Sequence, residues 1–98
     1  MDVKIHFQGI NFEWDADKEL ANSKKHGFDF RTAVELFFDP FLMAVEDKLE
    51  DGEQRHHALG MVKNWQIIFV AFVWRGDNIR LISARLATNS ERKRYERG

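Results

Sequence analysis

The side chains in this sequence that could do chemistry are mostly cations. Arg55 opens one strand-like segment, and Arg80 and Arg85 lie in the last one. Lys25 and His26 end a predicted helix. The forked donors of arginine suit phosphate oxygens, and cleavage of RNA by the neighbouring 2′-hydroxyl requires stabilisation of extra negative charge in the transition state. The pattern therefore indicates a reaction on a phosphodiester that needs no metal.

Such a reaction also needs a base for the 2′-hydroxyl and an acid for the departing 5′ oxygen. His26 is the natural candidate because imidazole titrates near neutral pH, and Lys25 and Tyr95 are the alternatives. The two roles stay open among these residues. Arg92 and Lys93 precede Tyr95 in a basic final segment, where all three are candidates for binding RNA.

Strand geometry constrains how the arginines can act together. Because side chains alternate between the two faces of a strand, Arg80 and Arg85 point to opposite faces if their strand is regular. A bulge, or a strand that ends before Arg85, would reunite them. Without either, one of the two is structural and could hold the acidic loop predicted before Arg55. For each arginine alone, a salt bridge or a surface position explains the residue as well as catalysis does.

The sequence lacks the residues or motifs that several other reaction types require. The chain has no cysteine, which excludes disulfides, a thiolate nucleophile and zinc–thiolate sites. The four histidines, His6, His26, His56 and His57, lack the spacing of a metal-binding motif. A glycine-rich phosphate loop and a G-x-S-x-G nucleophile elbow are absent as well. We therefore expect an activity without a metal or cofactor.

The net charge of −1 hides an uneven distribution of charge along the chain. Residues 39–54 carry six acids against one lysine, a balance of −5, whereas residues 75–98 carry seven bases against three acids, a balance of +4. A basic C-terminal quarter suits a nucleic-acid partner. The longest apolar run, residues 67–74, is too short to span a bilayer, and the first residues do not resemble a secretion signal. We expect a cytoplasmic protein without membrane contact.

The elements that would position these residues begin with a short strand that ends at residues 12–14. Asp15 is a good N-cap for a helix to His26, and Gly27 ends it. A second helix is predicted from Asp29 to the break at Asp39-Pro40. Its core face consists of Phe30, Ala33, Val34, Phe37 and Phe38.

Beyond residue 40 the apolar period becomes that of strands. Strands are predicted at 41–46, 55–62, 65–74 and 79–86, with a polar loop at 47–54 and turns at 63–64 and 75–78. Residues 3–7 are expected to lengthen the first strand. Thr88 and Glu91 form a capping-box pattern that starts a last, basic helix. We predict one domain over residues 1–98 with an α+β fold: a small antiparallel sheet, two N-terminal helices and one C-terminal helix.

Three segments of the sequence form an ordered set of motifs: Phe12–Asp15, Asn22–Phe28 and Ile82–Thr88, followed by Glu91, Arg92 and Tyr95. Together they resemble the BrnT family of type II toxins. The resemblance extends in order over about residues 12–96 and includes the helix before Asp39-Pro40, Arg55, Gly60 and the turn Arg75-Gly76-Asp77. The chain departs from the pattern at Leu86 and at Asn89-Ser90, where the family commonly has basic residues.

The resemblance implies a RelE-like ribonuclease fold and cleavage of RNA that halts translation. By matching positions, it gives as active-site residues Lys25, His26, Arg55, Arg80 and Arg85. It also implies a BrnA-type antitoxin with a ribbon-helix-helix domain, expected to form a heterotetramer with the chain and to make the contacts with promoter DNA. The alternative is a catalytically silent, toxin-like module that acts through its antitoxin in promoter autoregulation.

Overall fold

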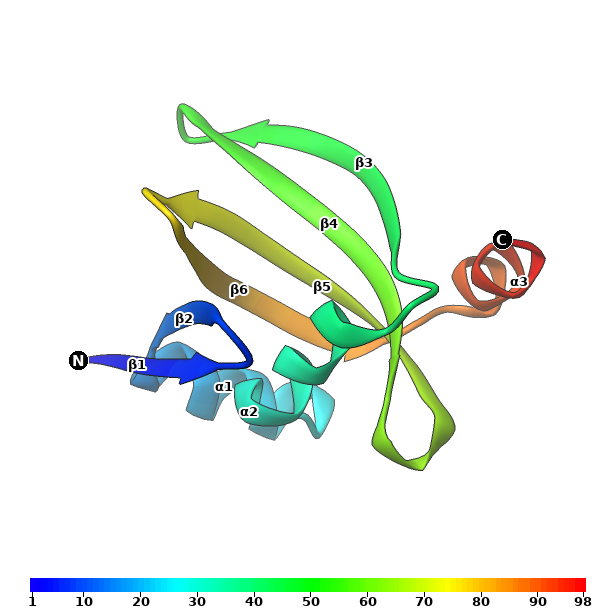
Figure 1. Ribbon diagram of the computed structural model, residues 1–98, viewed down its shortest axis with the longest axis horizontal. Helices are drawn as coiled ribbons and strands as arrows, with labels where there is room; N and C mark the ends of the chain where they lie inside the picture. The colour runs from blue at the N-terminus through cyan, green and yellow to red at the C-terminus, as the bar shows by residue number, and fades with distance from the viewer.

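A six-stranded sheet in the order β1-β2-β6-β5-β4-β3 forms the centre of the structure (Figure 1). The computed structural model describes residues Met1–Gly98. Its strands are β1 (Asp2–Phe7), β2 (Ile10–Asp15), β3 (Met43–Glu50), β4 (Glu53–Val62), β5 (Gln66–Arg75) and β6 (Asn78–Leu86). Its helices are α1 (Ala16–His26), α2 (Phe30–Ala33) and α3 (Asn89–Arg97), with 3₁₀ turns η1 (Val34–Phe38) and η2 (Lys63–Trp65). The α+β class is as predicted, and no helix is long and apolar enough to cross a membrane.

The sheet is mixed, and the prediction of a purely antiparallel sheet is wrong. The strands β3, β4, β5 and β6 form the expected antiparallel meander. In contrast, β2 pairs with β6 in parallel, with Phe12 opposite Ile79 and Glu13 opposite Arg80. A tight turn sets the direction of two consecutive strands, but most of the chain separates β2 from β6. No local signal in the sequence therefore reveals their pairing.

The N-terminal residues form a strand of their own and do not lengthen the first predicted strand. The strand β1 pairs antiparallel with β2 over the full length of both. Gln8 and Gly9 make the turn between them, with φ angles of 49° and 84°. Positive φ at both turn positions matches the twist of a β-hairpin, and Gly9 adopts it without steric cost.

The helix α1 begins and ends where the sequence predicts. The Asp15 carboxylate accepts hydrogen bonds from the amides of Asp17 and Lys18. Gly27 follows the last residue with a left-handed φ of 79°, a conformation that closes helices and favours glycine. The cations of the last turn, Lys24, Lys25 and His26, therefore lie where the helix dipole stabilises positive charge.

The second predicted helix is correct only in part. Asp29, where the helix is predicted to begin, caps it by accepting a hydrogen bond from the amide of Thr32. The α-helical part, α2, has only four residues, and the chain continues as the 3₁₀ turn η1. Short 3₁₀ segments are common at helix ends, and here the tighter winding buries Val34 and Leu36. Asp39 and Pro40 still mark the end of the helical segment.

The acidic segment 47–54 is mostly strand and not the loop that its composition predicts. The strand β3 continues to Glu50, and only Asp51 and Gly52 form the turn into β4. Their φ angles are 51° and 74°, which Asp-Gly pairs favour in two-residue hairpins. The acidic side chains consequently lie along an extended ribbon and pair with arginines of β4 and β5.

The main hydrophobic core lies on the face of the sheet that α2 and η1 cover. Its buried residues are Phe12, Trp14, Phe28, Phe30, Ala33, Val34, Leu36, Ala58, Val62, Ile68, Val70, Ile79, Leu81 and Ala84. The predicted helical face is part of it, since Phe37 and Phe38 also pack against this cluster. Gly60 allows η1 to approach the sheet: a Cβ there would lie 2.7 Å from Cγ of Leu36. Because α2 and η1 pack on this face, a site for a ligand has to lie on the opposite face of the sheet.

Candidate active site

A β-bulge in β6 brings Arg80 and Arg85 to the same face of the sheet. In the pairing with β5, Val73 lies opposite Arg80 and Phe69 lies opposite Arg85. Val73 and Phe69 are four residues apart and share a face of β5, whereas their partners are five residues apart. The extra residue is Ile82, which has no partner in the ladder. Of the two possibilities that the sequence left open, the structure has the bulge. We call this side of the sheet the arginine face.

Arg55 also belongs to the arginine face. His57 of β4 lies opposite Ala71 of β5, and Ala71 is two residues from Phe69, the partner of Arg85. Alternation along β4 places Arg55 on the same side as His57. The predicted catalytic arginines therefore share one face, opposite the main core.

A pocket of about 340 Å³ opens between this face and α3. Its lining side chains are Val45, Glu46, Lys48, Glu50, His57, Leu59, Phe69, Arg85, Glu91 and Arg94. Among the predicted catalytic residues, Arg85 is the one that lines it. Lys48 and Arg94 form no ion pair within the protein, so their charges are available to an anionic ligand.

Phe69 holds two functional side chains in this pocket. The guanidinium carbon of Arg85 lies 4.2 Å from the centroid of the Phe69 ring, and the His57 ring stacks on it with centroids 5.2 Å apart. Nδ1 of His57 is 2.8 Å from the carbonyl oxygen of Glu46. Because a carbonyl oxygen can only accept, Nδ1 carries the proton, and Nε2 of the neutral ring keeps a lone pair. A cation and a proton acceptor thus both contact the Phe69 ring.

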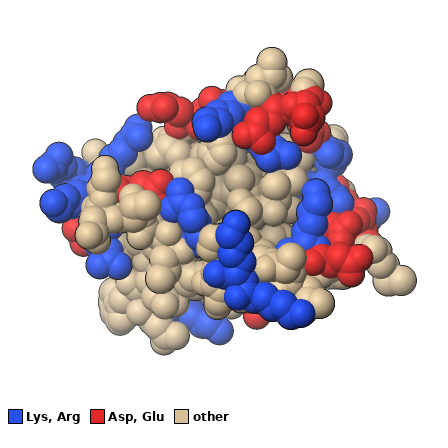
Figure 2. Space-filling view, turned by 180° about the vertical axis from the view of Figure 1, so that it is seen from behind, with Lys and Arg blue, Asp and Glu red and all other residues tan.

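Each predicted catalytic arginine is paired with a carboxylate. The pairs are Arg85–Glu91 at 2.7 Å, Arg80–Asp2 at 3.0 Å and Arg55–Glu50 at 2.6 Å. Hydrogen bonds from Arg85 lower the pKa of Glu91, and hydrogen bonds from Arg80 lower the pKa of Asp2. Figure 2 shows acidic side chains beside cationic ones at several places on this side of the molecule. An RNA phosphate must therefore compete with a carboxylate for these arginines.

Lys25 and His26 lie at the C-terminal end of α1 and do not line this pocket. The same sequence motif contains Asn22, which is buried and has a structural role. Asn22 donates hydrogen bonds to the carbonyl oxygens of Phe28 and Ala84 and accepts one from the Ala84 amide. Lys25 and His26, in contrast, form no side-chain hydrogen bond or ion pair in the fold, which leaves both free to contact a ligand.

The predicted RNA-binding residues of α3 differ in their surroundings. Tyr95 is buried, packs with Leu59 and Ile67, and donates its hydroxyl to Asp39 at 2.5 Å. This arrangement gives Tyr95 a packing role that anchors α3. Arg92 and Lys93 are exposed on the same helix.

Three further residues of the pocket were not found from the sequence as site residues. From the sequence, His57 is weighed only as a possible metal ligand. The structure contains no group of three or more His, Asp or Glu side chains that could hold a metal. The sequence does contain a signal for placing His57 in the site: it lies two residues from Arg55 in a strand, so the two side chains must share a face. Lys48 and Arg94 give no such signal, since the irregular register of β3 and the docking of α3 bring them together.

Comparison with known proteins identifies the family. The family model described as "Ribonuclease toxin, BrnT, of type II toxin-antitoxin system" matches residues 14–91. The chain belongs to the BrnT family. The crystal structure of the Brucella abortus ribonuclease toxin BrnT aligns with a TM-score of 0.63 and 31% sequence identity, over 78% of this chain and 94% of that chain. No curated protein sequence matches the chain. The resemblance seen in the sequence is confirmed, and membership in a type II toxin family implies an antitoxin partner.

Proposed function

We propose that this BrnT family member cleaves RNA by attack of a 2′-hydroxyl on the adjacent phosphate, without a metal, and thereby inhibits translation in the cytoplasm. The observation that carries the proposal is the placement of Arg85 and His57 on the ring of Phe69. The reaction needs a cation at the phosphate and a proton acceptor beside it, and these side chains supply both. Residues 1–98 are proposed to act as a single domain.

The roles in this mechanism follow from the atoms that each side chain presents. Nε2 of His57 accepts the proton of the 2′-hydroxyl as its oxygen attacks phosphorus. Arg85 and Arg94 hold the phosphoryl oxygens, whose negative charge grows in the transition state. Lys48, which lines the same pocket, donates a proton to the departing 5′ oxygen. The products are a 2′,3′-cyclic phosphate and a 5′-hydroxyl end.

Lys25 and His26 are the alternative candidates for the two proton transfers assigned here to Lys48 and His57. Their place in the family motif supports them, and so does their lack of polar contacts in the fold. The remaining predicted residues are proposed to bind flanking phosphates or to position those that do: Arg55, Arg80, Arg92, Lys93 and Tyr95.

A second candidate function is binding without cleavage, and the pairing of Arg85 favours it. Arg85 donates two hydrogen bonds to Glu91, and Leu86 follows it where the family commonly has a basic residue. If RNA cannot displace Glu91, the chain acts only through its antitoxin in promoter autoregulation.

The antitoxin is proposed to be a BrnA-type protein with a ribbon-helix-helix domain. We expect it to form a heterotetramer with this chain and to make the contacts with promoter DNA.

Cleavage of end-labelled RNA in the presence of EDTA tests the proposed activity, with and without ribosomes. The purified chain is compared with His57→Ala, His26→Ala and Arg85→Ala variants, each shown by circular dichroism to be folded. We expect cleavage to fall about 100-fold or more in His57→Ala and Arg85→Ala. The parent chain should produce 2′,3′-cyclic phosphate ends.

His26→Ala is the matched control, because it makes the same substitution on α1, outside the pocket. If His26→Ala loses cleavage and His57→Ala keeps it, the proton transfers belong to α1. A folded parent chain that leaves RNA intact in every condition would favour the silent function.

A further inference from the structure

An apolar groove lies along the C-terminal end of α3, separate from the pocket proposed for RNA. Its volume is about 830 Å³. Its apolar lining comes from the loop before β3, the start of β3, the end of β4 and the turn before β5: Pro40, Phe41, Leu42, Met43, Met61 and Trp65. Phe41 is 76% exposed and Trp65 is 86% exposed. Large exposed apolar side chains gathered in one groove are typical of interaction sites.

Trp65 occupies a backbone position that suits glycine. Its φ is 61°, and the preceding Asn64 has a φ of 62°. Asparagine tolerates this left-handed conformation, but a bulky residue there costs about 1 kcal/mol or more. Packing within the chain does not offset this cost, because the Trp65 ring is almost fully exposed. Tryptophan is also among the residues that contribute most to protein interfaces, so contact with a partner explains its presence here.

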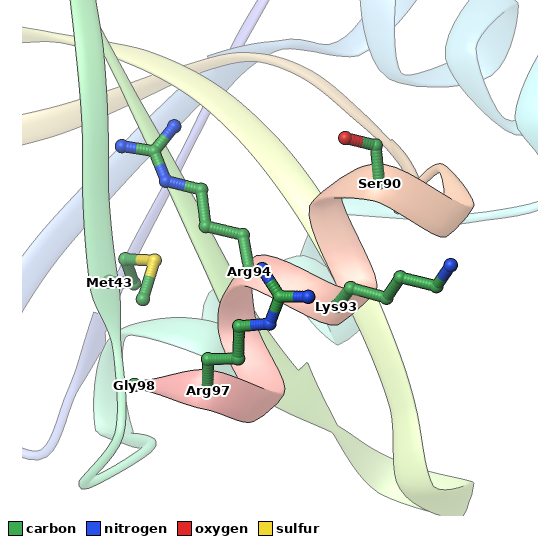
Figure 3. Close-up of a pocket in the computed structure, with 6 residues that line it drawn as sticks. All are labelled: Met43, Ser90, Lys93, Arg94, Arg97 and Gly98. Carbon is green, nitrogen blue, oxygen red and sulfur yellow. The ribbon is translucent and has the colours of Figure 1, made fainter.

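A basic strip on α3 connects the groove to the pocket proposed for RNA. The hollow drawn in Figure 3 shares Met43 and Arg97 with the groove. It shares Arg94 with the RNA pocket. Arg94 and Lys93 point in different directions from α3 in Figure 3, and neither they nor Arg97 form ion pairs. A ligand along α3 therefore meets apolar side chains at one end and unpaired cations at the other.

We propose that the groove and the basic strip form the binding site for the antitoxin. The fitting segment of the partner carries apolar side chains beside several acidic ones, as an amphipathic acidic helix does. This inference rests on the antitoxin partner that family membership implies, and not on the ribonuclease mechanism. Binding there engages Arg94 and withdraws it from the RNA pocket, which provides a route to neutralisation without direct contact to His57.

The test measures binding of the separately purified cognate antitoxin to the full chain by isothermal titration calorimetry. The variant is Trp65→Gly, which removes the exposed ring and relieves the positive φ. We expect affinity for the antitoxin to fall about tenfold or more, while the melting temperature stays the same or rises. A purely structural role of Trp65 predicts the opposite change in melting temperature. Phe41→Ser, at the other side of the groove, should weaken binding as well.

Trp74→Ala is the matched control, because Trp74 is 52% exposed but lies outside the groove. It should bind the antitoxin with the affinity of the parent chain. Unchanged affinity in both Trp65→Gly and Phe41→Ser would overturn the proposal. A parent chain that self-associates through the groove, with a dimer broken by Trp65→Gly and antitoxin binding unaffected, would overturn it in favour of a second copy. RNA cleavage, measured separately, decides the ribonuclease mechanism without bearing on these outcomes.

Discussion

At the scale of single residues, Tyr95 and Asp39 link α3 to the loop after η1. The Tyr95 hydroxyl donates to Oδ2 of Asp39 at 2.5 Å, and the Met61 amide donates to the same oxygen at 2.7 Å. Burial and the bond to Asp39 raise the pKa of Tyr95 to about 12. Burial opposes ionisation of Asp39, but hydrogen bonds from Tyr95 and from backbone amides lower its pKa. Both groups therefore keep the charge states that this hydrogen bond requires.

We expect Tyr95 to ionise near pH 12 in the folded chain. The chain has one tyrosine, so phenolate absorbance reports Tyr95 alone. Its folded pKa lies above the unfolded value of about 10, so the stabilisation is complete below about pH 10 and is lost as the pH rises beyond it. The urea-unfolded chain is the control and should titrate near the ordinary value. Equal midpoints in the two states would contradict the buried hydrogen bond.

At the scale of elements, Asn22 joins α1 to the edge of β6. The strand β6 pairs with β2 only at Ile79 and Arg80, so its later backbone groups on that side need other partners. Nδ2 of Asn22 donates to the Ala84 carbonyl at 2.8 Å, and Oδ1 accepts from the Ala84 amide at 3.0 Å. The side chain thus takes the place of a neighbouring strand.

Asn22→Ala is expected to destabilise the fold by about 3 kcal/mol, because it leaves buried donors and acceptors of β6 without partners. Urea unfolding measures this change. Ser23→Ala is the control: its hydroxyl also donates to Phe28, but Asn22 still reaches that carbonyl, so we expect a loss below about 1 kcal/mol. Similar losses in the two variants would show that Asn22 does not hold the edge of β6.

Local signals in the sequence predict the elements whose ends depend on nearby residues. Asp15 and Gly27 delimit α1, and the capping box of Thr88 and Glu91 starts α3, as predicted. The parallel pairing of β2 with β6 and the bulge at Ile82 depend on contacts between distant segments, so no local pattern predicts them. The same limit applies to the site, because Arg80 shares a face with Arg85 only through that bulge.

At the scale of the whole molecule, acidic and basic segments that are separate in sequence are interleaved in space. The hairpin of β3 and β4 places Glu50 beside Arg55, and the pairing of β4 with β5 places Glu53 beside Arg75. Figure 2 shows this mixture, with blue and red side chains in contact at the top and at the right of the view. Paired charges bind RNA weakly, because each new phosphate contact must break an existing ion pair.

Glu50→Gln is therefore expected to strengthen RNA binding. The substitution removes the carboxylate that lies 2.6 Å from Arg55, at the lining of the RNA pocket. A freed Arg55 can form one more phosphate contact, so we expect affinity to rise about fivefold at low salt, or about 1 kcal/mol. The gain should shrink at about 0.3 M salt, where exposed charges are screened. Fluorescence anisotropy with 2′-O-methyl RNA measures binding, because this RNA has no free 2′-hydroxyl to attack the phosphate.

Asp17→Asn separates the local effect from the effect of total charge. Both substitutions change the formal net charge from −1 to 0. Asp17 lies in the first turn of α1 and forms no ion pair, so its replacement frees no arginine. If pairing with carboxylates controls access to RNA, only Glu50→Gln tightens binding. Equal gains would assign the effect to the field of the whole molecule, and no gain in either variant would remove Arg55 from the RNA contact surface.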